Sequence, residues 1–247
     1  MLVTKAIILA AGVGSRLRPL TDDRPKCLLD VGGRTILDHQ VAALRRCGVE
    51  DVVMVLGYRS DLIRKHLGGS ARYVDNERYE DTNSLYSLWL ARDELASGAL
   101  VLNSDVLAPP ILFERLLRAP APDAVLVERG RDFEAEDMKV TLRGWQVVDF
   151  SKTLPPERAH AHNVGAAKFS RPDGSRLATY LEQLVAEGHE NDWVPMAFRE
   201  FASHWPLAAV ATDGLPWIEI DYPADLARAR TEIGPAILAI DSAVSAG

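Results

Sequence analysis

The sequence predicts an α/β fold in which a mixed, mostly parallel sheet is flanked by helices. In the first half of the chain, short apolar runs rich in β-branched residues alternate with helical patterns, as β-α-β crossovers do. Two of these helical patterns end at a glycine, the residue that commonly follows the last turn of a helix. The second half changes to strands in hairpin-like succession, which adds a small β-rich subregion to the Rossmann-like sheet.

In the first half, expected strands and helices take turns along the chain. The strands are 6–10, 51–56, 72–74 and 99–102. The helices are 36–47, 60–67 and 84–95, the first closed by Gly48 and the second by Gly68. After Pro109-Pro110, strands are expected within 123–128, 137–152 and 162–170, with a turn at Gly144. Helices over 173–186 and 195–201, a strand at 217–220 and a helix over 224–232 complete the pattern.

The length and composition favour one globular domain. The chain has 247 residues, 47% hydrophobic and 26% charged, and shows no linker, repeat or low-complexity block. We expect a single domain over 1–247, with halves of about 1–108 and about 109–233 and a tail at 234–247. The weakly amphipathic tail is expected to pack on the body or on a second subunit.

Charge and cysteine content exclude several classes of protein. The formal net charge is −7, whereas binding to nucleic acid depends on a basic surface. Cys27 and Cys47 cannot form a disulfide framework and have no metal-like spacing, which favours a reducing cytoplasm. No apolar run approaches the about 20 residues of a membrane helix, and the N-terminus lacks the pattern of a signal peptide. We therefore expect a cytoplasmic protein with no membrane and no nucleic-acid partner.

The stretch AIILAAGVGSRLRPLTDDRPKCLLDVGGR places a glycine pair directly after an apolar strand. Such backbone turns sharply and can approach a ligand closely. A dinucleotide-binding fingerprint would need a third glycine where Leu17 stands. An NTPase phosphate loop would need Gly-Lys-Ser/Thr where the chain has Ser15-Arg16-Leu17. The glycines alone are equally consistent with a plain tight turn.

Two cations change this balance, because Arg16 follows the glycines and Lys26 closes the same segment, which is too broken by glycine and proline to be helical. Free amides and an Arg–Lys pair suit a triphosphate. The string LAAGVGSRLRPLTDDRPKCLLDVGGRTILDHQ resembles the signature loop of the nucleotidyltransferase superfamily that makes sugar nucleotides and related activated alcohols, LAAGxGxRLxPLTxxxPKxLxxVxGxxxL. The resemblance implies an enzyme that transfers a nucleotidyl group and releases pyrophosphate.

The resemblance also assigns roles along this loop. Backbone near Gly12 would lie beside the base and sugar, Gly14 to Arg16 would hold the β- and γ-phosphates, and Lys26 would bridge the α-phosphate and the incoming phosphate. The implied nucleotide-binding residues are Leu9, Ala10, Ala11, Gly12, Gly14, Ser15, Arg16, Asn83, Ser84 and Ser104.

Two aspartates, Asp105 in LVLNSDVL and Asp221 in WIEIDYPADL, each follow an apolar strand. A strand-end aspartate commonly caps the next turn. Together with the opening loop, however, both match the family's metal-binding aspartates, which implies Mg²⁺ at Asp105 and Asp221. The family usually has Gly-Asp at the first position, where this chain has Ser104-Asp105. The expected catalytic residues are Arg16, Lys26, Asp105 and Asp221.

The segment YEDTNSLYSLWLA, residues 79–91, resembles the phosphocholine and phosphonate cytidylyltransferase branch of the superfamily. Asn83 could read a base edge, since its amide both donates and accepts hydrogen bonds. It could equally cap the helix that follows, and both roles are compatible. The branch resemblance implies CTP as the nucleotide.

Further matches to this branch lie in the second half. The resemblance implies acceptor-binding roles for Lys139, Lys152, Asn163, Asp192, Trp193 and Glu219. Asp192-Trp193 matches a position where an acidic–aromatic pair often lines the acceptor pocket. The branch usually has a glutamate in the pattern E-x-x-G, where this chain has His162 before Gly165. His160 and His162 alternate on a strand and could touch a phosphate, although such histidines are more often exposed polar residues.

We therefore expect a Mg²⁺-dependent transfer of CMP from CTP to a small phosphorylated or phosphonate acceptor, of the phosphocholine or 2-aminoethylphosphonate kind. The alternative is a sugar- or cyclitol-phosphate nucleotidyltransferase that uses another NTP, which the missing glutamate favours. A non-catalytic nucleotide-binding regulator is a third reading, against which Arg16, Lys26, Asp105 and Asp221 argue. A homodimer is possible.

Overall fold

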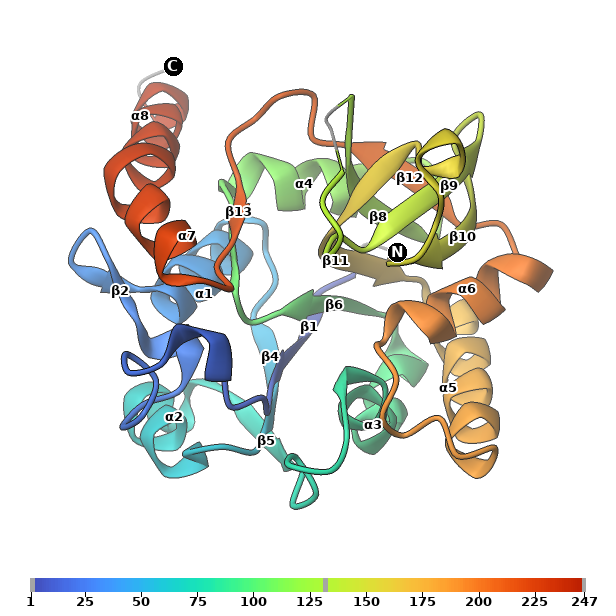
Figure 1. The fold of residues 1–247 in the computed structure, drawn as a ribbon, viewed down its shortest axis with the longest axis horizontal. Helices are drawn as coiled ribbons and strands as arrows, with labels where there is room; N and C mark the ends of the chain where they lie inside the picture. The colour runs from blue at the N-terminus through green and yellow to red at the C-terminus, as the bar shows by residue number, and fades with distance from the viewer. Residues whose placement is uncertain (1–2, 131–132, 246–247) are drawn as a thin grey trace.

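A nine-stranded mixed sheet forms the centre of the computed structural model, which describes residues 3–130 and 133–245 (Figure 1). The strand order is β5-β4-β1-β6-β11-β8-β12-β10-β9, and β5, β4, β1 and β6 run parallel. Strand β11 is antiparallel to both β6 and β8, and β10 is antiparallel to β12 and β9. The sheet therefore joins strands from both predicted halves, through the β6–β11 pair.

The strand bounds follow the apolar runs of the sequence. The main sheet contains β1 (Lys5–Ala10), β4 (Asp51–Leu56), β5 (Arg72–Asp75), β6 (Ala99–Asn103), β8 (Ala124–Arg129), β9 (Lys139–Arg143), β10 (Gln146–Ser151), β11 (Ala161–Phe169) and β12 (Ala208–Ala211). Two short ladders accompany it, β7 (Val106–Leu107) with β13 (Ile218–Glu219) and β2 (Asp30–Val31) with β3 (Arg34–Thr35).

Helices cover both faces of the sheet, so each face has its own apolar core. One core packs α3 (Ser84–Leu90), α5 (Arg171–Ala186) and α6 (Pro195–His204) against the sheet. The other packs α1 (Ile36–Arg46), α2 (Ser60–Leu67) and α4 (Pro110–Arg118). The near-continuous burial of β1, β4 and β6 is what a parallel sheet covered on two sides requires.

A third, smaller core lies beside the sheet and ties the opening loop to the C-terminal helices. Leu17 and Leu107 are fully or almost fully buried there with Ile220 and Ile237. The helices involved are α7 (Pro223–Arg228), a π-helical turn (Ala229–Ile233) and α8 (Gly234–Ser245). Ile237 is 4% exposed, so this part of the tail packs on the body of the protein. This is the first of the two outcomes that the sequence predicted for the tail.

Most predicted elements are confirmed, and the exceptions have local causes. The helix expected over 84–95 ends at Leu90 and continues as a 3₁₀ turn, Arg92–Ser97. The sequence reading missed α4, whose start at Pro110 follows the rule that proline suits the first turn of a helix. It also missed β12, only four residues of Ala and Val. The opening loop is not wholly irregular, since it contains 3₁₀ turns at Ser15–Leu17 and Lys26–Leu28.

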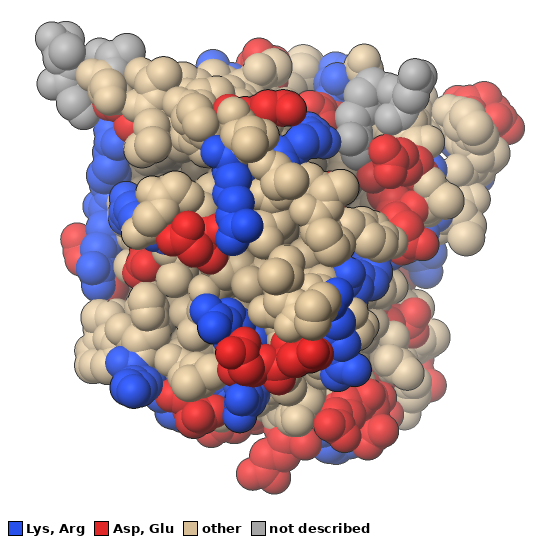
Figure 2. Space-filling model, turned by 60° about the vertical axis from the view of Figure 1, so that its left-hand side comes forward, with Lys and Arg blue, Asp and Glu red and all other residues tan. Residues whose placement is uncertain are grey.

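Within 3–130 and 133–245, no helix has the length and apolar character needed to cross a bilayer. The face shown in Figure 2 carries acidic and basic side chains side by side, without one broad basic area. This distribution agrees with the acidic net charge of −7.

Candidate active site

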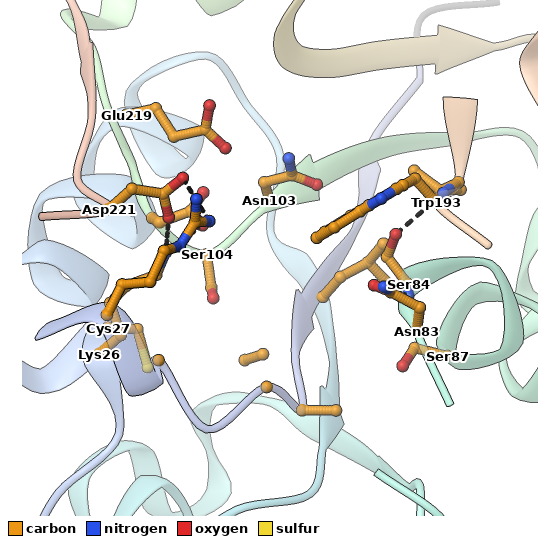
Figure 3. Close-up of a pocket in the computed structure, with 18 of the residues that line it drawn as sticks. Lys26, Cys27, Asn83, Ser84, Ser87, Asn103, Ser104, Trp193, Glu219 and Asp221 are labelled. Carbon is orange, nitrogen blue, oxygen red and sulfur yellow. Dashed lines mark hydrogen bonds and ion pairs between the residues drawn. The ribbon is translucent and has the colours of Figure 1, made fainter. Parts of the chain in front are cut away.

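A cavity of about 560 Å³ lies where the chain leaves the parallel strands β1 and β6. Ligands of α/β sheets are placed at this edge, beyond the carboxyl ends of the strands. Figure 3 shows its two walls: Lys26, Glu219 and Asp221 face Ser84 and Trp193 across the opening, with Asn103 between them. One wall is therefore charged, whereas the other is polar and aromatic.

The opening loop lines this cavity with backbone. Gly14 has φ +67°, in the left-handed region, and a Cβ there would lie 3.2 Å from the Lys26 Cβ. Its carbonyl is held by Leu17 N at 3.0 Å and by Thr21 Oγ1 at 2.9 Å. Within the described residues, the backbone amides of 12–16 donate to no backbone carbonyl. A run of free amides beside Arg16 and Lys26 is a suitable place for phosphate oxygens.

A second glycine, Gly57, lies close behind two residues of the cavity wall, Ala11 and Tyr79. A Cβ on Gly57 would lie 2.6 Å from the carbonyl oxygen of Ala11 and 2.6 Å from Cβ of Tyr79. The amide of the next residue, Tyr58, donates to that same carbonyl at 3.0 Å. Gly57 therefore allows the strand β4 exit to pack directly against the opening loop.

Lys26 lies between the two predicted metal-binding aspartates. Its Nζ is 2.7 Å from Asp105 Oδ2 and 2.7 Å from Asp221 Oδ1. Arg16 Nη2 is 2.7 Å from the other Asp221 oxygen. Burial lowers the pKa of Lys26, but the two carboxylates outweigh it and the net pKa lies above the ordinary value. For Asp221 the signs are opposite: burial raises its pKa, but the nearby charges of Lys26 and Arg16 lower it by more, so the net pKa lies below the ordinary value.

A third carboxylate completes an acidic cluster. Asp105, Glu219 and Asp221 each offer one oxygen, and these oxygens lie within 4.8 Å of one another. Burial, followed by the charges of Asp105 and Asp221, raises the pKa of Glu219 to about 8. Asp105 Oδ1 is buried and has no hydrogen-bond partner among the residues that the structure describes. Oxygen ligands with an unsatisfied buried carboxylate oxygen fit a hard divalent cation such as Mg²⁺.

Backbone pairing fixes the spacing of this cluster. In the β7–β13 ladder Glu219 pairs with Val106, and the amide of Ile220 donates to the Asp105 carbonyl at 3.1 Å. Because successive side chains of a strand point to opposite faces, Glu219 enters the cavity while its neighbour Ile218 packs in a core. Trp217, just before this strand, packs in a core as well. Asp105 and Asp221 thus meet although they are far apart in the chain.

The polar wall comes from the start of α3. Asn83 is the N-cap, and its side-chain oxygen accepts from the Ser84 amide at 2.8 Å. Ser84 Oγ accepts from the Val194 amide at 2.8 Å, which joins this helix to the segment before α6. Asn83 therefore has the capping role and also lines the cavity, so the two predicted roles are compatible in the structure.

The aromatic wall carries a cation of its own. Trp193 is 43% exposed, and Lys152 Nζ lies 4.5 Å from the centre of its ring. The same Nζ is 3.1 Å from Glu136 Oε2, and that oxygen is 3.5 Å from Arg16 Nη1. Glu136 thus links cations from the two halves of the protein at the mouth of the cavity.

Most of the predicted site residues lie around this one cavity. They are Leu9, Ala10, Ala11, Gly12, Gly14, Ser15, Arg16, Lys26, Asn83, Ser84, Ser104, Asp105, Lys152, Asn163, Trp193, Glu219 and Asp221. Two lie elsewhere. Lys139 is 6% exposed and donates to the carbonyl of Lys152 at 2.7 Å. The Asp192 carboxylate bonds His189 Nδ1 at 2.9 Å and does not line the cavity.

Sequence reasoning missed other residues of the cavity wall. They include Pro25, Cys27, Asn76, Tyr79, Thr82, Ser87, Asn103, Glu136, Met138, Val194, Pro195 and Tyr222. Asn103 directly precedes the Ser-Asp motif at a strand end, a position that could have suggested it. His162 was expected to be exposed but is 5% exposed and packs edge-on against Trp217 at 5.4 Å.

Comparisons with known proteins agree with this geometry. Residues 6–178 match the family model described as the MobA-like NTP transferase domain. CTP:phosphoglutamine cytidylyltransferase of Campylobacter jejuni is 28% identical over 90% of this chain and 97% of its own length. CMP-5'-(3-aminopropyl)phosphonate synthase of Streptomyces rubellomurinus is 40% identical over 94% of this chain and 39% of its own length.

A solved structure gives the same answer for the fold. The CTP:phosphocholine cytidylyltransferase of Streptococcus pneumoniae superposes with a TM-score of 0.77 at 25% identity, covering 92% of this chain and 97% of that one. The opening loop and Asp105 lie within the matched residues 6–178, and Asp221 lies beyond them. The chain belongs to the MobA-like NTP transferase family, and it is a nucleotidyltransferase.

Proposed function

We propose that this enzyme transfers CMP from CTP to a small phosphorylated or phosphonate acceptor of the phosphocholine or 2-aminoethylphosphonate kind. The observation that carries the proposal is one cavity of about 560 Å³ that is lined by free loop amides, three cations and four carboxylates, three of which form the acidic cluster. It holds what a nucleoside triphosphate and a second phosphate need. The cytidylyl group is inferred from the named activities of the relatives that match across nearly the whole chain.

The acidic cluster is the place for Mg²⁺ in this proposal. Asp105 and Asp221 would hold the ion, with Glu219 as a third oxygen donor within reach. The unpaired Asp105 Oδ1 supports this assignment, because a buried carboxylate oxygen without a partner is costly. When bound, such an ion neutralises charge on the transferring phosphate.

The chain's own groups bring together two anions that repel each other. The free amides from Gly14 to Arg16 bind the phosphates that leave, and Lys26 lies between the α-phosphate and the acceptor oxygen. That oxygen attacks the α-phosphorus in line, a new P–O bond forms, and the α–β bond breaks to release pyrophosphate. Catalysis by this site consists of positioning and charge neutralisation, which need no covalent intermediate.

Asn83 and the start of α3 are the proposed base-reading wall, since Asn83 lines the cavity opposite the charged wall. Its oxygen already caps the helix, so its amide hydrogens are the groups offered to a base. We place the enzyme in the reducing cytoplasm, where the free thiols of Cys27 and Cys47 are stable.

Pyrophosphate release with Mg²⁺ tests the function directly. CTP, UTP, GTP, ATP and dTTP would be crossed against phosphocholine, 2-aminoethylphosphonate, simple phosphonates, and sugar and cyclitol phosphates. Release with CTP and an amino-alcohol phosphate or phosphonate is expected. Release with sugar or cyclitol phosphates would move the substrate assignment to the alternative class, and binding of nucleotide without any turnover would indicate a regulator.

A further inference from the structure

At the mouth of the cavity, an ammonium group lies between an indole ring and a carboxylate. Lys152 Nζ is 4.5 Å from the centre of the Trp193 ring and 3.1 Å from Glu136 Oε2. An aromatic face with a nearby carboxylate is the arrangement that recognises alkylammonium groups. In this structure the group it holds belongs to the protein itself.

The two cations that neutralise Glu136 are also expected to bind phosphate groups in the proposed reaction. Its Oε2 is paired with Lys152 and, at 3.5 Å, with Arg16. Arg16 is assigned to the phosphates of the nucleotide, and Lys152 is the cation of the acceptor side that reaches the cavity. Phosphate groups would draw both cations away, because charge-assisted bonds to phosphate are strong. Glu136 would then face the acceptor without a counter-charge.

The backbone beneath this group is fixed by Lys139. Its buried Nζ donates to the carbonyl of Lys152 at 2.7 Å and to the carbonyl of Ala135 at 3.5 Å. These carbonyls belong to Lys152 itself and to the residue before Glu136. The separation between the two backbones is therefore set independently of their side chains, so Lys152 can swing away while Glu136 stays.

Other acids near the cavity are less suited to an ammonium group. Asp192 was expected to supply the acid, but its carboxylate is turned to His189 at 2.9 Å. Glu219 belongs to the cluster with Asp105 and Asp221, and Figure 3 shows it on the charged wall opposite Trp193. Glu136 is the carboxylate joined to the Trp193 face through a shared cation.

We propose that Glu136 and Trp193 form the subsite that binds a cationic amine of the acceptor, and that the amine replaces Lys152 Nζ in it. Lys152 then moves toward the acceptor phosphate or phosphonate. This inference rests on the proposed function, which supplies the acceptor. It makes Glu136 a specificity residue, in a chain that lacks the glutamate usual in the pattern before Gly165.

A matched pair of acceptors tests the subsite. 2-Aminoethylphosphonate and n-propylphosphonate differ by an ammonium against a methyl group. Wild-type enzyme should prefer the amine at least tenfold in kcat/KM. Glu136→Gln and Trp193→Leu should each lower the ratio of the two kcat/KM values at least about sixfold, because the KM for the amine rises. Their kcat/KM should fall much less for n-propylphosphonate than for the amine.

Two control variants exclude general effects of the substitutions. Glu134→Gln makes the same change in the same loop, outside the cavity wall. Trp145→Leu removes another exposed tryptophan that also carries a cation, Arg129, at 4.9 Å. Both should keep the wild-type preference. Equal use of the two acceptors by wild type, or an unchanged preference in Glu136→Gln, would overturn the subsite while CMP transfer stands.

Binding measured by calorimetry separates this inference from the proposed function. If no acceptor yields pyrophosphate, the proposed function fails, and the subsite is then judged by affinity for the same two compounds with CTP present. At least tenfold tighter binding of the amine, lost in Glu136→Gln, supports the subsite. Equal affinities for the two compounds overturn it.

Discussion

Lys26 Nζ lies 2.7 Å from Asp105 Oδ2, so a cation proposed for phosphate and a carboxylate proposed for Mg²⁺ are paired with each other. A second carboxylate, Asp221, is equally close to the same nitrogen. A metal-bound nucleotide would offer new partners to both kinds of charged group at once: its phosphate oxygens to the lysine, and its metal ion to the two carboxylates. Neither component alone would do so.

Replacement of Lys26 tests the contribution of its charge. Lys26→Ala should lower kcat by about 100- to 1000-fold, because a preorganised charge at the reacting phosphates is lost. Steady-state kinetics would measure this, with the exposed Lys65→Ala as the control. A rise in KM with unchanged kcat would instead make Lys26 a residue that binds ground state and transition state equally.

Asp105→Asn tests the metal site. We expect loss of Mg²⁺-dependent turnover and Mn²⁺ binding at least about tenfold weaker, because one charged oxygen ligand is removed. Electron paramagnetic resonance measures free Mn²⁺ without turnover. Chelation should silence the wild-type enzyme, and added Mg²⁺ should restore it. The exposed Asp61→Asn should bind Mn²⁺ like wild type, and near-normal activity of Asp105→Asn would remove Asp105 from the site.

A carboxyl pair away from the cavity makes stability depend on pH. Asp123 is 3% exposed, its Oδ1 accepts from the Ser170 amide at 2.7 Å, and its side chain bonds that of Asp173. Burial raises the pKa of Asp123 from 3.8 to about 6. A raised carboxyl pKa means that the folded state holds the proton more tightly than the unfolded chain does.

The stabilisation from this proton is therefore present below pH 4 and is lost as the pH rises through about 6. Asp123→Asn keeps the oxygen that accepts from Ser170 and supplies a neutral donor toward Asp173. It should be more stable than wild type at pH 8, by on the order of 2 kcal/mol, with little difference at pH 4. Urea unfolding across this range measures it. Asp213→Asn, at an exposed carboxylate, should show no such trend.

Gly57→Ala tests the contact between the β4 exit and the opening loop. The new Cβ would meet backbone at 2.6 Å, so the cost should be about 1–3 kcal/mol of unfolding free energy, with weaker nucleotide binding. Gly69→Ala is the matched control, since a Cβ there has open space. Thermal unfolding compares the two variants. Equal stability would mean that the loop moves aside at little cost.

The sequence predicted features that have local signals. The strand–helix alternation, the glycine pair at Gly14 and the two strand-end aspartates are local patterns, and the cavity brings those aspartates together with Lys26. Glu136 had no such signal, because an exposed loop acid resembles any other until tertiary packing places it beside Arg16 and Lys152. Asp192 illustrates the reverse: its position suggested the acceptor pocket, but a histidine three residues earlier binds its carboxylate.

The β7–β13 ladder gives the site an order of assembly during synthesis. Asp105 and the opening loop leave the ribosome first, and Asp221 follows more than a hundred residues later. At about 5–20 residues per second, several seconds separate the two. During that time the growing chain has its loop for phosphate but only one of the paired aspartates. Catalytic competence therefore arrives late, when Ile220 bonds the Asp105 carbonyl and closes the acidic cluster.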